Sequence, residues 1–244
     1  MKKIILASLL CLFSFISHAT VVEMQTSQGT ITIHLFDQHT PKTVNNFLAY
    51  IGDEAYDNTV IHRSVDNFVI QGGGFTFTDK FTAINTLDAV SNEPVLSNVK
   101  GTIAMAKQEG NADSATSQWF FNLKDNSSNL DRQNGGFTVF GQISTDSYAV
   151  VDAITELQHC GEIPVVNLTA EQCADSSTVL NPENLVTINK VLVLDDDPNS
   201  SADLTPTANT LINEQPDTGD DDSSSGSMAW LLALLGMTCL RRKG

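Results

Sequence analysis

Residues 61–73 read Ile-His-Arg-Ser-Val-Asp-Asn-Phe-Val-Ile-Gln-Gly-Gly, and this stretch decides the fold. It predicts a strand, a tight turn at Asp66-Asn67 and a second strand, because Asp and Asn favour turns between two apolar runs. Side chains alternate across a strand, so Val69 and Gln71 are expected on one face of the second strand. The stretch therefore combines basic, polar and apolar side chains on one β-hairpin.

A second short stretch shows the same alternation. Ser117-Gln118-Trp119-Phe120-Phe121 predicts Gln118 and Phe120 on one face of a strand and Trp119 and Phe121 on the other. We assign Trp119 and Phe121, together with Phe140, to the core.

The same patterns along the rest of the chain predict a mainly β fold. Strands are expected over 21–26, 29–36, 60–63, 67–71, 102–107, 117–122, 137–143 and 185–194. A helix is expected from Thr40 as N-cap, with Pro41 in its first turn and an apolar stripe at Val44, Phe47, Leu48 and Ile51. A second helix is expected over 147–157. Eight short strands and two helices predict a closed eight-stranded antiparallel barrel capped by two helices.

The first 19 residues have the layout of a secretory signal peptide. A basic start, Met1-Lys2-Lys3, precedes an apolar run over 4–16, and Ala19 provides a small residue for cleavage. The run is too short to span a membrane as a helix. We therefore expect export to the periplasm or cell envelope of a Gram-negative-type bacterium. Cys11 would leave with the signal.

The remaining chain divides into one domain, a spacer and a tail. Residues 20–194 form the expected domain, and 195–227 form an acidic, Ser- and Asp-rich stretch that predicts a disordered linker. Residues 228–244 hold a 13-residue apolar run from Met228 to Leu240 and a basic end. This tail is typical of bacterial sorting signals of the GlyGly type, cut by a rhomboid-like protease, or of a plain C-terminal membrane anchor.

Two cysteines, Cys160 and Cys173, belong to the domain itself. In an exported chain such a pair predicts a disulfide, and a structural role is favoured over a redox switch. Two cysteines alone do not make a structural zinc site.

Charge and motifs exclude several classes of function. The 244 residues hold 13 Lys and Arg against 29 Asp and Glu, a net charge of −16, which argues against nucleic acid as the main partner. The sequence has no Gly-x-Ser-x-Gly elbow, P-loop, His-Glu-x-x-His or paired-cysteine metal motif. His34, His39, His62 and His159 are scattered. We therefore expect neither a cofactor nor a metal.

Several motifs in register identify a family resemblance. Four segments resemble motifs of cyclophilin-type peptidyl-prolyl isomerases. They are the His62-Arg63 pair with the Phe-x-x-Gln-Gly-Gly that follows, Ala104-Met105-Ala106, Ser117-Gln-Trp-Phe and Val139-Phe-Gly. Their order and spacing match over about residues 21–193, and the resemblance is closest to exported bacterial cyclophilins. It implies an eight-stranded barrel with a shallow groove that binds a proline-containing peptide.

The resemblance also implies roles for individual residues. Arg63 would be the catalytic arginine, with His62 beside it. The apolar seat for the proline ring would consist of Phe68, Val69, Phe120 and Leu130. The peptide backbone would be held by Gln71, Ala106, Lys107 and Gln118, with Phe137 at the rim.

This sequence departs from the best-known eukaryotic pattern at several positions. Val69 replaces a Met, Lys107 an Asn, Asn129 a Trp and Phe137 a His, and Asp66-Asn67 replaces a Pro-Gly turn. The missing Trp is expected to weaken cyclosporin binding.

Three hypotheses follow for the function. The first is an isomerase, a monomer without cofactors, acting on proline-containing exported proteins. The second is a module that binds such segments without turnover, and the third is a tethered envelope spacer. Arg63 favours the first hypothesis. A charged hydrogen-bond donor stabilises the twisted X–Pro bond of the transition state, whereas binding a peptide without turnover does not require one.

Overall fold

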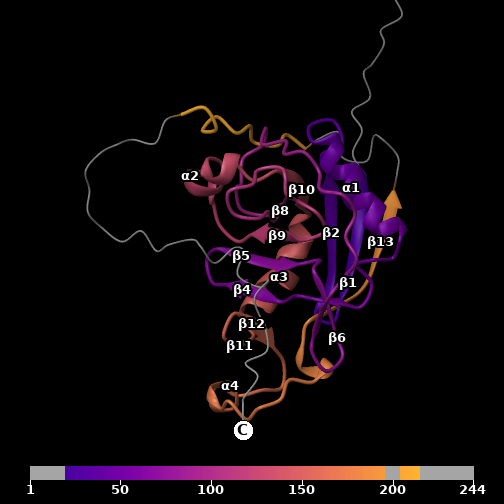
Figure 1. The fold of residues 1–244 in the computed structure, drawn as a ribbon, viewed down its shortest axis with the longest axis vertical. Helices are drawn as coiled ribbons and strands as arrows, with labels where there is room; N and C mark the ends of the chain where they lie inside the picture. The colour runs from indigo at the N-terminus through magenta and orange to yellow at the C-terminus, as the bar shows by residue number, and fades with distance from the viewer. Residues whose placement is uncertain (1–19, 196–203, 215–244) are drawn as a thin grey trace, which may run out of the picture.

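Antiparallel strands dominate this computed structural model, which describes residues 20–195 and 204–214. The strands are β1 (Val21–Thr26), β2 (Gly29–Leu35), β3 (Thr59–Val60), β4 (Arg63–Val65), β5 (Val69–Gly72), β6 (Phe75–Phe77), β7 (Phe81–Ala83), β8 (Thr102–Met105), β9 (Trp119–Asn122), β10 (Val139–Ile143), β11 (Gln158–Cys160), β12 (Ile163–Val165) and β13 (Thr187–Asp195). The helices are α1 (Pro41–Gly52), α2 (Ser127–Leu130), α3 (Tyr148–Thr155) and α4 (Ala170–Ala174). Figure 1 shows α1 beside β2 and β13, and a small lobe of β11, β12 and α4 below the main sheet.

The main sheet is curled, and its closure into the predicted eight-stranded barrel is not confirmed. Its eleven strands pair in the order β4-β5-β9-β8-β10-β2-β1-β13-β3-β6-β7, so β4 and β7 are the ends. The predicted strand over 60–63 is interrupted, because the Ile61 N–H bonds to Val186 O at 2.9 Å and the His62 N–H to Gln71 O at 3.2 Å. At this point the backbone stops bonding to the segment that leads into β13 and starts bonding to β5. Residues 61–62 therefore connect the β13 side of the sheet with the β5 side.

The predicted alternation in β9 is confirmed, and it separates two apolar cores. Trp119 and Phe121 belong to the main core with Phe140, whereas Phe120 belongs to a second cluster on the opposite face of the sheet. This second cluster consists of Phe36, Val69, Leu96, Ala104, Ala106, Phe120, Leu130, Phe137 and Val139, with Phe68 and Leu204 packed against it.

Both predicted helices are present, but α1 is capped differently from the prediction. Its stripe of Val44, Phe47 and Ile51 is buried as expected, and Thr40 is the N-cap residue without a side-chain cap bond. Instead, the Glu93 carboxylate accepts from the Thr43 N–H and hydroxyl, both at 2.9 Å. A carboxylate at a helix N-terminus satisfies free N–H groups and the positive end of the dipole.

The short strands β6, β7, β11 and β12 were not expected from the sequence. Each has only three residues, too few for an alternating pattern to stand out. The helices α2 and α4 are similarly short, with four and five residues.

Part of the predicted linker, residues 204–214, is hydrogen-bonded to the domain, although most of these residues are exposed to solvent. Asn209 is 9% exposed, and its N–H bonds to Val95 O at 2.9 Å. Its amide nitrogen donates to Pro94 O at 3.1 Å and Asp131 O at 3.0 Å, and its amide oxygen caps the following turn at Leu211 and Ile212. Composition alone did not indicate this, because the anchor is one amide among many Asp, Ser and Thr residues.

Asn209→Ala should lower the free energy of unfolding by about 2 kcal/mol, since it removes an amide and leaves buried carbonyls unpaired. Urea denaturation of the full chain measures this. Asn213→Ala is the matched control, because Asn213 is exposed in the same segment, and it should change stability by less than about 0.5 kcal/mol. Equal midpoints for the two variants would contradict the docking of this segment.

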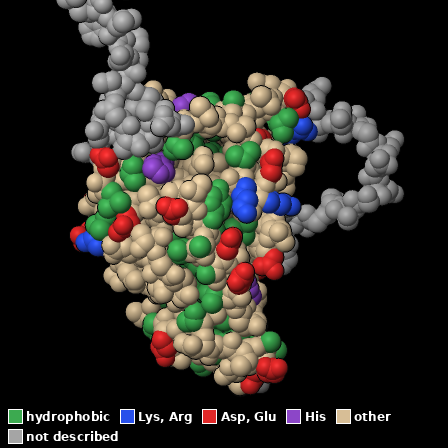
Figure 2. Space-filling model, turned by 180° about the vertical axis from the view of Figure 1, so that it is seen from behind, with side chains coloured by type: hydrophobic (Ala, Val, Ile, Leu, Met, Phe, Trp, Pro, Cys, Tyr) green, Lys and Arg blue, Asp and Glu red, His purple; other side chains and the backbone are tan. Residues whose placement is uncertain are grey.

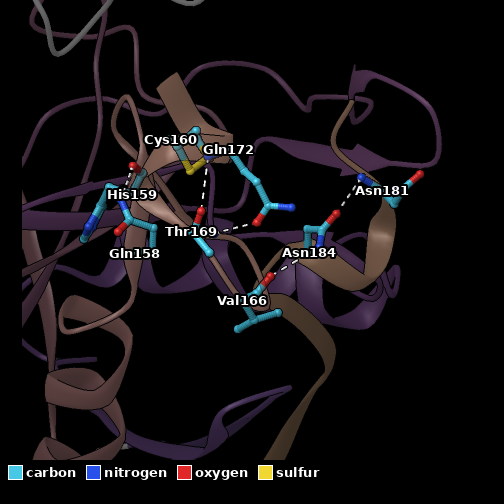
Figure 3. The surroundings of a disulfide bond; sticks show 9 residues. Gln158, His159, Cys160, Val166, Thr169, Gln172, Asn181 and Asn184 are labelled. Atoms are coloured by element: carbon cyan, nitrogen blue, oxygen red, sulfur yellow. Dashed lines mark hydrogen bonds between the residues drawn. A yellow bond between two sulfur atoms is a disulfide. The ribbon is translucent and has the colours of Figure 1, made fainter. Parts of the chain in front are cut away.

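The predicted disulfide is confirmed. Cys160 on β11 and Cys173 on α4 are bonded, with their Cα atoms 4.7 Å apart. Figure 3 shows the surrounding supports: Thr169 and Gln172 bond each other at the start of α4, and Asn184 donates to Val166 O at 3.2 Å. The small lobe is therefore held by one covalent link and by side-chain caps.

Replacing both cysteines with Ala should lower the free energy of unfolding by about 3 kcal/mol, the chain-entropy value for a loop of this size. Chemical denaturation under non-reducing conditions measures the difference. A variant as stable as the parent chain would contradict a structural role and favour the redox alternative.

The predicted signal peptide and C-terminal tail lie outside the described residues. Within 20–195 and 204–214, no helix is both long and apolar enough to span a bilayer.

Candidate active site

Strand register gathers the central predicted residues in one row. Arg63 on β4 lies opposite Gln71 on β5, Gln71 lies opposite Phe120 on β9, and Phe120 lies opposite Ala104 on β8. Side chains at directly opposed positions of an antiparallel sheet project from the same face. The guanidinium, an amide and an aromatic ring are therefore neighbours across three strands.

The predicted apolar seat forms one cluster. Phe68, Val69, Phe120 and Leu130 pack together with Ala106 and Phe137 in the second cluster. The rings of Phe120 and Phe137 meet edge to face, with centroids 5.8 Å apart. Val69, Phe120 and Leu130 are fully buried, whereas Phe68 is partly exposed and marks where the cluster meets the surface.

Polar groups beside this cluster keep free hydrogen-bonding capacity. The Gln71 amide nitrogen donates to the Gln118 amide oxygen at 2.9 Å, and the Ala106 N–H bonds to Gln118 O at 2.9 Å. The Gln71 amide oxygen and Arg63 Nη1 are buried without a hydrogen-bond partner in the described part of the chain. The row thus contains one buried acceptor and one buried charged donor that no described group satisfies.

Arg63 has an acidic partner that sequence reasoning missed. Its Nε donates to Glu162 Oε2 at 2.7 Å, and the side chains are 8% and 46% exposed. Glu162 lies 99 residues further along the chain and belongs to no motif, so only the fold brings the two together.

His62 is buried beside Arg63 and packs edge to face against Phe75, with ring centroids 4.9 Å apart. Burial lowers the pKa of His62 to about 4, and this outweighs its hydrogen bonds to the Val60 backbone and the Gln118 side chain. The imidazole is therefore neutral near pH 7, which suits a packing and hydrogen-bonding role beside the guanidinium.

The predicted backbone contact Lys107 is directed at a loop of the protein. Its Nζ donates to Asn134 O at 2.8 Å and Gly136 O at 2.6 Å, and lies 4.9 Å from the centre of the Phe137 ring. Burial lowers its pKa to about 8, with an opposing attraction from Asp113. In this arrangement Lys107 braces Phe137 and the loop before it.

A buried polar group next to Leu130 was also missed by sequence reasoning. The Asp131 carboxylate is fully buried and accepts from Ser97 Oγ at 2.6 Å, from the Asn98 N–H at 2.8 Å and from the Asn98 amide at 2.9 Å. These bonds join the chain next to Leu130 to the segment at Ser97 and Asn98. No sequence motif distinguishes Asp131 from other acidic residues.

The surface charge, the cavities and the metal-ligating side chains complete the description of the site. Figure 2 shows acidic side chains scattered over one face, with few basic ones among them. A cavity of about 370 Å³ lies elsewhere, lined by Tyr50, Asp53, Ala55 and residues 84–87. Within the described residues, no group of His, Cys, Asp and Glu is arranged to hold a metal ion.

Comparison with known proteins identifies the family of the chain. A sequence model of the cyclophilin type peptidyl-prolyl cis-trans isomerases matches residues 21–174, more than half of the chain. The chain belongs to this family. This cyclophilin is therefore an enzyme of the peptidyl-prolyl isomerase class.

Named relatives include bacterial isomerases. The chain is 41% identical over 141 residues to a peptidyl-prolyl cis-trans isomerase of Acinetobacter baylyi, covering 57% of this chain and 73% of the relative. It is 40% identical over 140 residues to peptidyl-prolyl cis-trans isomerase B of Escherichia coli, covering 55% and 83%. A crystal structure of a cyclophilin type isomerase from Cryptosporidium parvum shares the fold, with a TM-score of 0.53, 20% identity, and coverage of 73% of this chain and 99% of that one.

The buried, neutral His62 should make this cyclophilin sensitive to acid. Its pKa is near 6.5 when unfolded and about 4 when folded, so the unfolded chain binds the proton first as the pH falls. Above about pH 6.5, protonation of His62 does not lower the free energy of unfolding. As the pH drops towards 4, this protonation lowers the free energy of unfolding by roughly 3 kcal/mol. The difference in unfolding free energy between the parent chain and His62→Gln should therefore vary with pH in this window. Parallel curves for the two proteins would show that His62 keeps an ordinary pKa.

Proposed function

We propose that this cyclophilin catalyses rotation about X–Pro bonds in exported proteins, with Arg63 acting electrostatically beside the apolar seat. The observation that carries the proposal is the row Arg63, Gln71 and Phe120 across β4, β5 and β9, with Arg63 Nη1 free of a partner within the described residues.

The reaction needs no bond to carbon. Amide resonance gives X–Pro rotation a barrier of about 18–20 kcal/mol, and rotation takes tens of seconds or more without a catalyst. In the twisted transition state the prolyl nitrogen regains its lone pair and the carbonyl leaves conjugation. A donor that binds either atom more strongly in that state lowers the barrier. A guanidinium is charged at every physiological pH and suits this role.

The seat supplies the restraint that rotation requires. A proline ring held against Phe68, the partly exposed side chain of the seat, stays fixed while the preceding carbonyl turns. The backbone of the peptide would pair with the free amide oxygen of Gln71 and with groups at Gln118 and Ala106. Apolar surroundings strengthen the effect of Arg63, because the local dielectric is lower than that of water. A 10⁵-fold acceleration corresponds to roughly 7 kcal/mol.

We further propose that the enzyme works in the periplasm or cell envelope. The signal-peptide layout of residues 1–19 and a disulfide in the domain support export. The apolar tail over 228–244 would act as a membrane tether or as a GlyGly-type sorting signal for a rhomboid-like protease. Its clients would be proline-containing, unfolded exported chains, which a monomer can serve.

Arg63→Ala should reduce catalysed cis/trans exchange by on the order of 10²-fold, because it removes the charged donor from the transition state. Exchange spectroscopy on a short Ala-Pro peptide with the full chain measures this. Arg132→Ala is the matched control, since Arg132 is a more exposed arginine paired with Glu214, and it should leave turnover unchanged.

The outcomes separate the hypotheses. Unchanged turnover in a folded Arg63→Ala variant would refute the role of Arg63. If neither the parent chain nor the variant accelerates exchange while both bind the peptide, the holding-module hypothesis replaces the proposal.

A further inference from the structure

We propose that Glu162 is a positioning residue for Arg63: it holds the guanidinium at Nε and leaves the Nη1 end for substrate. The proposal rests on the catalytic role proposed for Arg63 and adds to it the group that orients it.

The bond between the two side chains fixes one end of the guanidinium. Arg63 Nε donates to Glu162 Oε2 at 2.7 Å. Because the guanidinium is planar, a bond at Nε together with the side chain's own Cδ sets the plane in which both Nη groups lie. Arg63 Nη1 has no partner within the described residues, although it is buried. The carboxylate therefore orients the group without occupying that end.

Burial makes this pair different from an ordinary surface ion pair. Exposed pairs contribute little, because solvent screens them and both side chains stay mobile. Here the arginine side chain is only 8% exposed, and a buried charge that loses its partner is strongly destabilised. Without Glu162, we expect the guanidinium to leave its place in the row and turn towards solvent.

Glu162 itself is held by backbone geometry. Cys160 pairs with Ile163, so Gly161 and Glu162 form a two-residue turn between β11 and β12. Gly161 has φ of +67°, as the first central position of a type II′ turn requires. The carbonyl oxygen of Glu162 accepts from the Ser64 N–H at 2.7 Å, which fastens the turn to β4 beside Arg63.

The hairpin that carries this turn is anchored at both strands. On β11, Cys160, labelled in Figure 3, is bonded to Cys173 of α4. On β12, Val165 forms a β-bridge with Leu185, and the Val166 N–H bonds to Asn184 O at 2.9 Å. The small lobe thus serves the site: it presents one carboxylate to Arg63 from a fixed turn.

The test compares kcat and KM for peptide isomerisation in the full chain and two variants. Glu162→Ala should lower kcat about 10-fold with little change in KM, because the donor is misplaced while the seat is intact. Glu162→Gln should lose less than about 3-fold, since its amide oxygen accepts the same bond. Glu156→Gln is the matched control, an exposed carboxylate near the same lobe, and should behave like the parent chain.

Two readouts separate positioning from a general structural role. In an Arg63→Ala background, adding Glu162→Ala should cause no further loss, whereas a structural defect would cost the same in both backgrounds. The Nε–Hε resonance of Arg63 in ¹⁵N NMR should be present in the parent chain and in Glu156→Gln, and should shift or vanish in Glu162→Ala.

The proposal is overturned if Glu162→Ala matches the parent chain, if it raises turnover, or if its loss persists without Arg63. Failure of the proposed function is distinguishable, because it shows as an inactive parent chain or as an Arg63→Ala variant that is fully active.

Discussion

The register of β4, β5, β9 and β8 is the constraint on which both the second core and the site depend. It aligns Arg63, Gln71, Phe120 and Ala104 across the sheet. A slip of one residue in any of these pairings would turn that strand's side chains to the other face and exchange Phe120 for Trp119. The two clusters on opposite faces oppose such a slip, because each would then receive a ring of the wrong size and polarity. Core packing therefore holds the row of Arg63, Gln71 and Phe120 in place.

The polar groups around this row have a common arrangement. Arg63, Lys107 and Asp131 are buried charges, and each is bonded by fixed groups: a carboxylate, loop carbonyls, and hydroxyl and amide donors. Buried charges persist only with such partners. The partners come from the lobe that carries Glu162, from the loop that ends at Phe137, and from Ser97 and Asn98 before β8. The polar groups around the row are thus held by segments outside the four strands.

Much of this was predictable from the sequence, for physical reasons. Alternation in residues 69–71 and 118–121 predicted the faces of Gln71, Phe120 and Trp119, because strand side chains alternate wherever one face is buried. The disulfide followed from the export layout. Long-range polar contacts were not predictable: Glu162 reaches Arg63 and Glu93 caps α1 only through tertiary folding. Asn209 gave no signal within a polar segment. Closure of the barrel is not confirmed, and the break at Ile61–His62 is a detail of strand pairing that the residue pattern does not show.

The most direct test of the central claim is where the proline ring of a bound Ala-Pro peptide lies. Intermolecular NOEs between the ring protons and assigned side chains of the full chain would locate it. We expect NOEs to Phe68, the partly exposed side chain of the seat, with Arg63 Nη resonances shifting on addition of the peptide. NOEs confined to Tyr50 and Leu87, which line the separate cavity, would contradict it.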